Sequence, residues 1–361
     1  MKSFLIFLAL FISLNATTLH PTEHELKQKI GRMLMVGFDD EKLYRDSKIV
    51  KDINRYAIGG VILFDRFYDD RAKVKNISSP KQLKELTKKL KHYSTKALFI
   101  AVDQEGGKVA RLKAKYGFDE FPSAKEVSAL GYEKAKEIYK KQAIMLSEMR
   151  IDCDFAPVVD LAVNPKNKVI YGLERSYGSD AKEVAKYAEI FMDELEVEDI
   201  VSVVKHFPGH GSSLADSHKG FVDVSKTWSK KELEPYQILI DKQKLRMVMT
   251  AHVFNSQLDE KYPATLSYKV NTKLLRNKMG FNGVIISDDL QMKAISSHYS
   301  LKETVTLAIN AGVDMLLFGN QLADQDIDEL IETIYKQVKS GAIPYERILE
   351  SNKRIKYVLK Y

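Results

Sequence analysis

A pair of adjacent aspartates and a closely spaced aspartate and histidine are the residues most able to carry out a reaction. Asp288 and Asp289 directly follow an apolar run, and Asp216 and His218 lie two residues apart in a polar loop. A carboxylate held at a strand end can attack the anomeric carbon of a sugar while a proton donor about 5–5.5 Å away protonates the leaving oxygen. A histidine beside a carboxylate can be that donor, because the carboxylate fixes its tautomer and basicity. These residues therefore predict a retaining glycosidase.

The spacing settles only part of this assignment. Side chains two residues apart on an extended segment point to the same side, which favours Asp216 and His218 as a pair. Adjacent side chains on a strand point to opposite faces, so Asp288 and Asp289 cannot be separated from the pattern alone. Asp289 precedes a helical segment and could instead be a helix cap.

Other polar residues follow apolar runs in the same way. They are Asp103, Gln104, Glu105 and Arg111 after one run, Asp160 after the next, Lys205, His206 and His210 after a third, and His252 after a fourth. Each could be a buried polar group with no role in chemistry. Their recurrence at the same end of consecutive runs favours a shared site instead.

The elements that position these residues are eight short apolar, β-branched runs with room for a helix between them. We expect strands at Met33–Val36, Gly60–Phe64, Ala97–Val102, Asp154–Val159, Val201–Val204, Met247–Ala251, Val284–Ser287 and Val313–Phe318. Strands that are apolar throughout are typical of a parallel sheet covered by helices on both faces. Eight such units predict an α/β fold, a single (β/α)8 barrel with its site at the carboxyl ends of the strands. An open doubly wound sheet is the alternative, since periodicity does not show closure.

Signals for helix ends lie between these runs. Ser79-Pro80, Asp180-x-x-Glu183 and Ser300-x-x-Glu303 are start signals, and Gly312 is a stop signal. Helices at about 324–340 and 344–359 follow the last strand and leave no room for a second domain. We therefore expect one catalytic domain over residues 19–361.

The N-terminus differs from the rest of the chain. Lys2 precedes an apolar run, Phe4–Leu14, which is followed by small and polar residues to Thr18. This pattern predicts a signal peptide over residues 1–18 and export, to the periplasm in our interpretation. An uncleaved N-terminal membrane anchor is the alternative, because Leu14 stands where a small residue is usual.

Composition restricts the partners. The 56 basic and 49 acidic residues give a formal net charge of +7, and the basic residues are scattered, which argues against a nucleic-acid partner. Cys153 is the single cysteine, so no disulfide forms within the chain, and a buried thiol is expected.

The run Lys205–Gly211, followed by Asp216-Ser217-His218, resembles the signature of the β-N-acetylglucosaminidases of glycoside hydrolase family 3. The similarity covers most of the chain beyond the N-terminal run. Further matches are Gly31–Phe38, Gly59–Phe64, Asp103–Arg111, Arg175–Gly178, Ser287–Met292 and Ala311–Leu316.

The resemblance implies a role for each matching residue. It makes Asp288 the nucleophile, and His218 the acid/base supported by Asp216. It makes Asp103, Arg111, Arg175, Lys205 and His206 hydrogen-bonding partners of the terminal sugar. His210 is expected to shape its loop and His252 to act structurally or indirectly, whereas Asp160 is left open between structure and function.

The resemblance also implies a substrate. Related β-glucosidases take a glutamate acid/base from outside the barrel, and the Asp216–His218 loop replaces it here, which favours N-acetylglucosamine over glucose. We expect hydrolysis of terminal β-linked N-acetylglucosamine from peptidoglycan-derived glycans or muropeptides by a monomer without a cofactor. Phosphate as acceptor, glucosidase activity, a metal hydrolase and a non-catalytic muropeptide-binding barrel are the alternatives. One departure is Val222, where family members commonly carry proline, and it predicts a more mobile loop.

Overall fold

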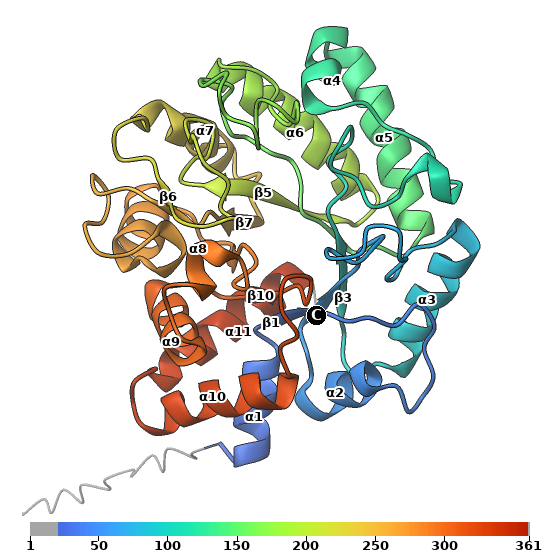
Figure 1. Cartoon of the computed structure of the whole chain (residues 1–361), viewed down its shortest axis with the longest axis vertical. Helices are drawn as coiled ribbons and strands as arrows, with labels where there is room; N and C mark the ends of the chain where they lie inside the picture. Colours follow the sequence, from blue (N-terminus) through green and yellow to red (C-terminus); the bar gives the residue numbers. More distant parts are fainter. Residues whose placement is uncertain (1–20, 360–361) are drawn as a thin grey trace, which may run out of the picture.

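The computed structural model describes residues 21–359, and these residues form a ring of helices around one parallel sheet (Figure 1). The strand order is β10-β1-β2-β3-β4-β5-β7-β9. The strands are β1 (Leu34–Gly37), β2 (Gly60–Ile62), β3 (Phe99–Val102), β4 (Cys153–Asp154), β5 (Val201–Phe207), β7 (Met247–Thr250), β9 (Val284–Ser287) and β10 (Leu316–Phe318). The predicted signal peptide lies outside the described residues. Within those residues, no helix has the length and apolar character needed to cross a membrane.

The sheet closes on itself between β9 and β10. Ile286 bridges Met315 in parallel, the Ser287 amide donates to the Met315 carbonyl at 3.0 Å, and the Leu290 amide donates to the Leu317 carbonyl at 3.0 Å. Closure confirms the predicted (β/α)8 barrel and excludes the open doubly wound sheet.

The helices cover the outside of the barrel in chain order (Figure 1). They are α1 (Glu23–Gly31), α2 (Lys48–Tyr56), α3 (Pro80–Tyr93), α4 (Ala124–Leu130), α5 (Tyr132–Glu148), α6 (Ala181–Val197), α7 (Glu234–Asp241), α8 (Lys293–Ser296), α9 (Leu301–Ala311), α10 (Ile327–Lys339) and α11 (Tyr345–Leu359), with a π-helical segment at Lys269–Lys278. Short 3₁₀ segments lie at Ala114–Tyr116, Lys230–Leu233 and Ala264–Leu266.

The predicted helix signals act as expected, with one difference. The Ser79 hydroxyl accepts from the Gln82 amide, Ser300 forms a full capping box, and Gly312 ends α9 in the left-handed conformation at φ 105°. The Asp180 carboxylate accepts from the amides of Lys182 and Glu183, but it is a simple N-cap without the reciprocal bond. Cys153 is buried, as predicted.

Only β9 has the predicted bounds, and the differences at β4 and β5 are the ones that affect the site. β4 ends at Asp154, but the backbone that follows remains bonded to β5 through an isolated parallel bridge between Val158 and Lys205. β5 continues beyond Val204 to Phe207, so Lys205 and His206 are strand residues.

A second, two-stranded sheet was not predicted. It pairs β6 (Val222–Asp223) with β8 (Val253–Phe254) in parallel, and Val222 is buried. Strands of two residues are too short to show a periodic pattern. Because Val222 pairs with Val253, it holds the end of the loop that carries Asp216 and His218. A second contact holds the same loop, since the Ala294 amide donates to the Ser217 carbonyl at 3.2 Å.

Candidate active site

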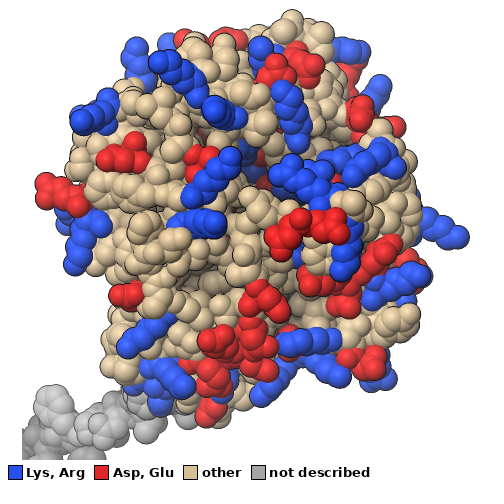
Figure 2. Space-filling model, viewed as in Figure 1, with Lys and Arg blue, Asp and Glu red and all other residues tan. Residues whose placement is uncertain are grey.

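A cavity of about 550 Å³ opens at the carboxyl ends of the strands. All eight residues predicted for the site line it, namely Asp103, Arg111, Arg175, Lys205, His206, Asp216, His218 and Asp288. Lys205 and His206 lie in β5, Asp103 and Asp288 directly follow β3 and β9, and the others lie in loops, so only the closed barrel brings them together. Figure 2 shows the hollow near the middle of this face, with basic side chains around it.

The two adjacent carboxylates after β9 differ in protonation. Burial alone would raise the pKa of Asp288, but His252, His206 and His218 outweigh it and hold this pKa below its usual range. Burial raises the pKa of Asp289 to about 7, and the charge of Asp288 adds to that rise. Asp288 is therefore the ionised carboxylate at neutral pH, which favours it over Asp289 as the nucleophile.

Asp289 has bonds that suit a structural role. Its Oδ1 accepts from the Gln291 amide at 3.0 Å, and its carboxylate lies against Gly319, where a Cβ would stand 2.6 Å from Oδ2. It caps the turn after β9 and is not the N-cap residue of α8, which is Met292.

His252 holds the backbone directly after β9 by a hydrogen bond. Its Nε2 lies 2.9 Å from the Asp289 carbonyl oxygen and therefore donates, and its Nδ1 lies 2.8 Å from the Thr265 hydroxyl. Burial lowers the pKa of His252, and the charge of Asp288 opposes this shift. These contacts agree with the expected indirect role.

Asp216 and His218 form a pair at the mouth of the cavity. Asp216 Oδ1 lies 2.9 Å from His218 Nδ1 and also accepts from the His218 amide at 3.0 Å. The hydrogen bond to His218 lowers the pKa of Asp216 to about 2. Burial would lower the pKa of His218, but the bond to Asp216 and the charge of Asp288 raise it overall. The pair thus holds a proton close to an ionised carboxylate.

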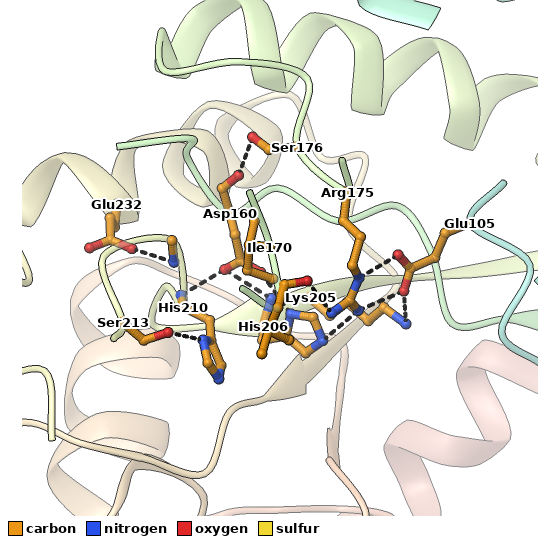
Figure 3. Close-up of polar contacts among 12 residues, drawn as sticks. Glu105, Asp160, Ile170, Arg175, Ser176, Lys205, His206, His210, Ser213 and Glu232 are labelled. Atoms are coloured by element: carbon orange, nitrogen blue, oxygen red, sulfur yellow. Dashed lines mark hydrogen bonds and ion pairs between the residues drawn. The ribbon is translucent and has the colours of Figure 1, made fainter. Parts of the chain in front are cut away.

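The floor of the cavity is a network of paired charges. The Lys205 ammonium lies 2.8 Å from Asp103 and 2.7 Å from Glu105. The Arg175 guanidinium binds both oxygens of Glu105 at 2.7 Å, as Figure 3 shows. Arg111 lies 2.8 Å from Asp103. Fixed donors and acceptors of this kind suit the recognition of sugar hydroxyl groups.

Glu105 was not among the predicted site residues. It joins the two predicted cations, and burial would raise its pKa, but Arg175 and Lys205 lower it overall. Its place two residues after Asp103, before a glycine pair, was the signal in the sequence.

Asp160 also belongs to this site, although the sequence left its role open. Its Oδ2 lies 2.7 Å from His206 Nδ1, and its Oδ1 accepts from the His210 amide at 2.7 Å (Figure 3). The carboxylate thereby places the proton of His206 on Nδ1 and turns Nε2 toward Arg175 Nη2, 3.3 Å away. His210 has its Nδ1 2.8 Å from the Ser213 hydroxyl, which agrees with a role in shaping the loop.

The model of the glycosyl hydrolase family 3 N-terminal domain matches residues 25–358. The chain belongs to glycoside hydrolase family 3. This family 3 chain is 38% identical over 273 residues to a beta-hexosaminidase of Tolumonas auensis, covering 74% of the chain and 77% of that protein. It is 33% identical over 331 residues to beta-hexosaminidase A of Pseudoalteromonas piscicida, covering 84% of the chain but 53% of the relative.

A solved structure agrees with these similarities. The family 3 beta-N-acetylglucosaminidase from Paenibacillus sp. str. FPU-7 superposes with a TM-score of 0.83 at 32% identity. The superposition covers 93% of this family 3 chain and 62% of the other protein. The chain thus spans 53% of the Pseudoalteromonas relative and 62% of the Paenibacillus protein.

Proposed function

We propose that this protein is a retaining β-N-acetylglucosaminidase in which Asp288 is the nucleophile and His218, held by Asp216, is the acid/base. The observation that carries the proposal is the ionised, half-buried Asp288 in one cavity with a histidine whose Nδ1 is occupied by Asp216. This bond leaves Nε2 as the atom available to a substrate. The family and its named relatives make the chain a glycoside hydrolase of the β-hexosaminidase class.

The reaction takes two steps with these groups. Asp288 attacks the anomeric carbon and forms a glycosyl ester while His218 Nε2–H protonates the departing oxygen. The neutral His218 then takes a proton from water, the water oxygen attacks the anomeric carbon, and the Asp288 carboxylate leaves. Asp216 stabilises the protonated ring in the first step.

The floor of the cavity supports recognition of the terminal sugar. Asp103, Arg111, Arg175, Lys205 and His206 present fixed polar atoms, each oriented by Glu105, by Asp160 or by one another. A preformed network costs little reorganisation on binding, which favours a defined sugar.

The substrate and location complete the proposal. We take the sugar to be N-acetylglucosamine on peptidoglycan-derived fragments, met outside the inner membrane if residues 1–18 direct export. Relatives named beta-hexosaminidase and beta-N-acetylglucosaminidase support the sugar. The acceptor is water, with phosphate as the competing acceptor because a neutral histidine repels an anion less than a carboxylate does.

The test is hydrolysis of an aryl N-acetyl-β-glucosaminide and an aryl β-glucoside by the wild-type protein and two variants. Asp288→Asn should abolish release of the aryl group, whereas Asp289→Asn, the matched control, should retain it. Addition of an external anion such as azide to Asp288→Asn distinguishes a lost nucleophile from misfolding, since it should yield the inverted glycosyl azide. Near-normal turnover by Asp288→Asn would refute the mechanism, and equal rates on both aryl glycosides would refute the sugar assignment.

A further inference from the structure

The segment 208–213 joins the two halves of the active site. It begins directly after β5, which carries Lys205 and His206, and it leads into the loop that carries Asp216 and His218. The position of the Asp–His pair therefore depends on how firmly this segment is held.

Two side chains that follow the loop in the chain return to this segment and bind its backbone. The Trp228 indole Nε1–H donates to the Pro208 carbonyl at 2.9 Å. Glu232, in the 3₁₀ segment after β6, accepts through one carboxyl oxygen from the amides of Gly211 at 3.0 Å and Ser212 at 3.3 Å. The loop of the Asp–His pair is thus closed at its base.

A second acid binds the amide directly before these two. Asp160 Oδ1 accepts from the His210 amide at 2.7 Å, and its Oδ2 lies 2.7 Å from His206 Nδ1. Asp160 and Glu232 are both buried, and Figure 3 shows them on either side of the His210 backbone. Two buried acids therefore hold three consecutive amides, those of residues 210–212, and one of these acids also orients a residue of the cavity floor.

The segment fits closely against Glu232 and is bound through its carbonyls as well. Gly209 has φ 117°, and a Cβ there would stand 2.6 Å from the Glu232 Cβ, so only glycine allows this approach. Asn167 donates to the carbonyls of residues 210 and 211 at 2.8 Å and 3.0 Å. Asn164 donates to those of residues 212 and 213 at 3.2 Å and 3.0 Å. The loop therefore extends from a fixed backbone.

The far end of the loop is held by other contacts. Val222 pairs with Val253, and the Ala294 amide donates to the Ser217 carbonyl. These contacts do not involve segment 208–213, so they leave the start of the loop to the groups that bind this segment.

We propose that Glu232 is a positioning residue for the proton donor: by holding the amides of residues 211 and 212, it fixes the start of the loop and thereby the place of His218 relative to Asp288. The inference rests on the proposed function, in which His218 protonates the leaving oxygen. Glu232 is not among the described residues that line the cavity, so it acts through the backbone. A misplacement of about 1 Å in a catalytic group can cost about 100-fold in rate.

The experiment measures kcat/KM for a series of aryl N-acetyl-β-glucosaminides that runs from activated to poor leaving groups. An activated aryl group departs without protonation, whereas a poor one needs the proton of the acid/base. In Glu232→Met, which removes the acceptor and keeps an unbranched side chain, kcat/KM should fall about tenfold or more for the poorest leaving group and about threefold or less for the most activated one. A general loss of folded protein would lower the whole series by one factor.

Two conservative variants of the same residue test the hydrogen bonds themselves. Glu232→Gln keeps an oxygen that can accept both amides, so it should stay within about threefold of the wild type across the series. Glu232→Asp withdraws the acceptor by one methylene and should show the same selective loss on poor leaving groups, which keeps the test independent of how well the methionine variant folds.

Asp180→Ala is the matched control. The Asp180 carboxylate likewise accepts from two consecutive amides, those of Lys182 and Glu183, but at the start of α6 and at an exposed position. Its series should run parallel to that of the wild type. A selective loss on poor leaving groups in Asp180→Ala would overturn the assignment to Glu232.

His218→Ala separates the two proposals. If this variant loses most on poor leaving groups while Glu232→Met and Glu232→Asp lower every substrate by the same factor, the positioning role is wrong and the proposed function stands. If His218→Ala shows no dependence on the leaving group, the proposed function itself has failed.

Discussion

The negative charge of Asp216 should raise the pKa of His218 and thereby fix the pH above which kcat/KM declines. Replacing Asp216 by Asn keeps an oxygen that can accept from His218 Nδ1, 2.9 Å away, and removes the negative charge. The variant therefore separates electrostatic support of the histidine from its orientation.

The size of the effect follows from the coupling of the pair. The hydrogen bond to His218 lowers the pKa of Asp216 from 3.8 to about 2. At 1.36 kcal/mol per pKa unit, this drop corresponds to about 2 kcal/mol. Because the side chains of Asp216 and His218 are 29% and 46% exposed, solvent screening leaves about 1 kcal/mol. Coupling is reciprocal, so the pKa of His218 should fall in Asp216→Asn, and the protonated ring should lose support worth a factor of about five.

The assay is the pH dependence of kcat/KM with an aryl N-acetylglucosaminide that has a poor leaving group. The alkaline limb reports loss of the proton from His218 in the free enzyme, so it should move to lower pH in the variant. Asp223→Asn is the matched control, since Asp223 is exposed and accepts only from the Ser225 amide. An alkaline limb at the wild-type pH, or one at higher pH, would refute the role of Asp216.

Three further outcomes are expected. Asp160→Asn removes the charge that binds His206 and the His210 amide, and should lower the free energy of unfolding in urea by about 2 kcal/mol and reduce kcat/KM; wild-type stability would contradict the assignment. Burial raises the pKa of Glu232 from 4.5 to about 7, so between these pH values the unfolded chain loses a proton that the folded chain keeps, and stability falls by up to about 3 kcal/mol as pH rises. Glu232→Gln should therefore show a smaller fall in Tm from pH 5 to pH 8 than the wild type, and an unchanged slope would count against it. Gly211→Ala would place a Cβ 1.9 Å from the Leu161 carbonyl oxygen and should lower the stability by about 2 kcal/mol, which a thermal melt would detect; an unchanged Tm would show that the backbone relaxes.

Local patterns were sufficient for the eight strands and for the helix ends, whereas closure of the barrel was shown only by the contacts between β9 and β10. Buried parallel strands are apolar throughout, so each of the eight is visible as a short run, and the capping box at Ser300 uses residues three apart in the chain. β6 and β8 were missed because two residues cannot show a period, and the predicted mobility at Val222 has yet to be measured.

The active site, too, was predicted only in part from the sequence. Residue type and position predicted a carboxylate after a strand and an Asp–His pair in a loop, and the family resemblance favoured Asp288 over Asp289. Only the tertiary structure gives a physical difference between Asp288 and Asp289, because their pKa values depend on burial and on charges from other segments. It also decided the roles of Glu105 and Asp160, whose partners lie 70 and 46 residues away along the chain. Such pairings depend on distances across the closed barrel, which no local pattern in the sequence contains.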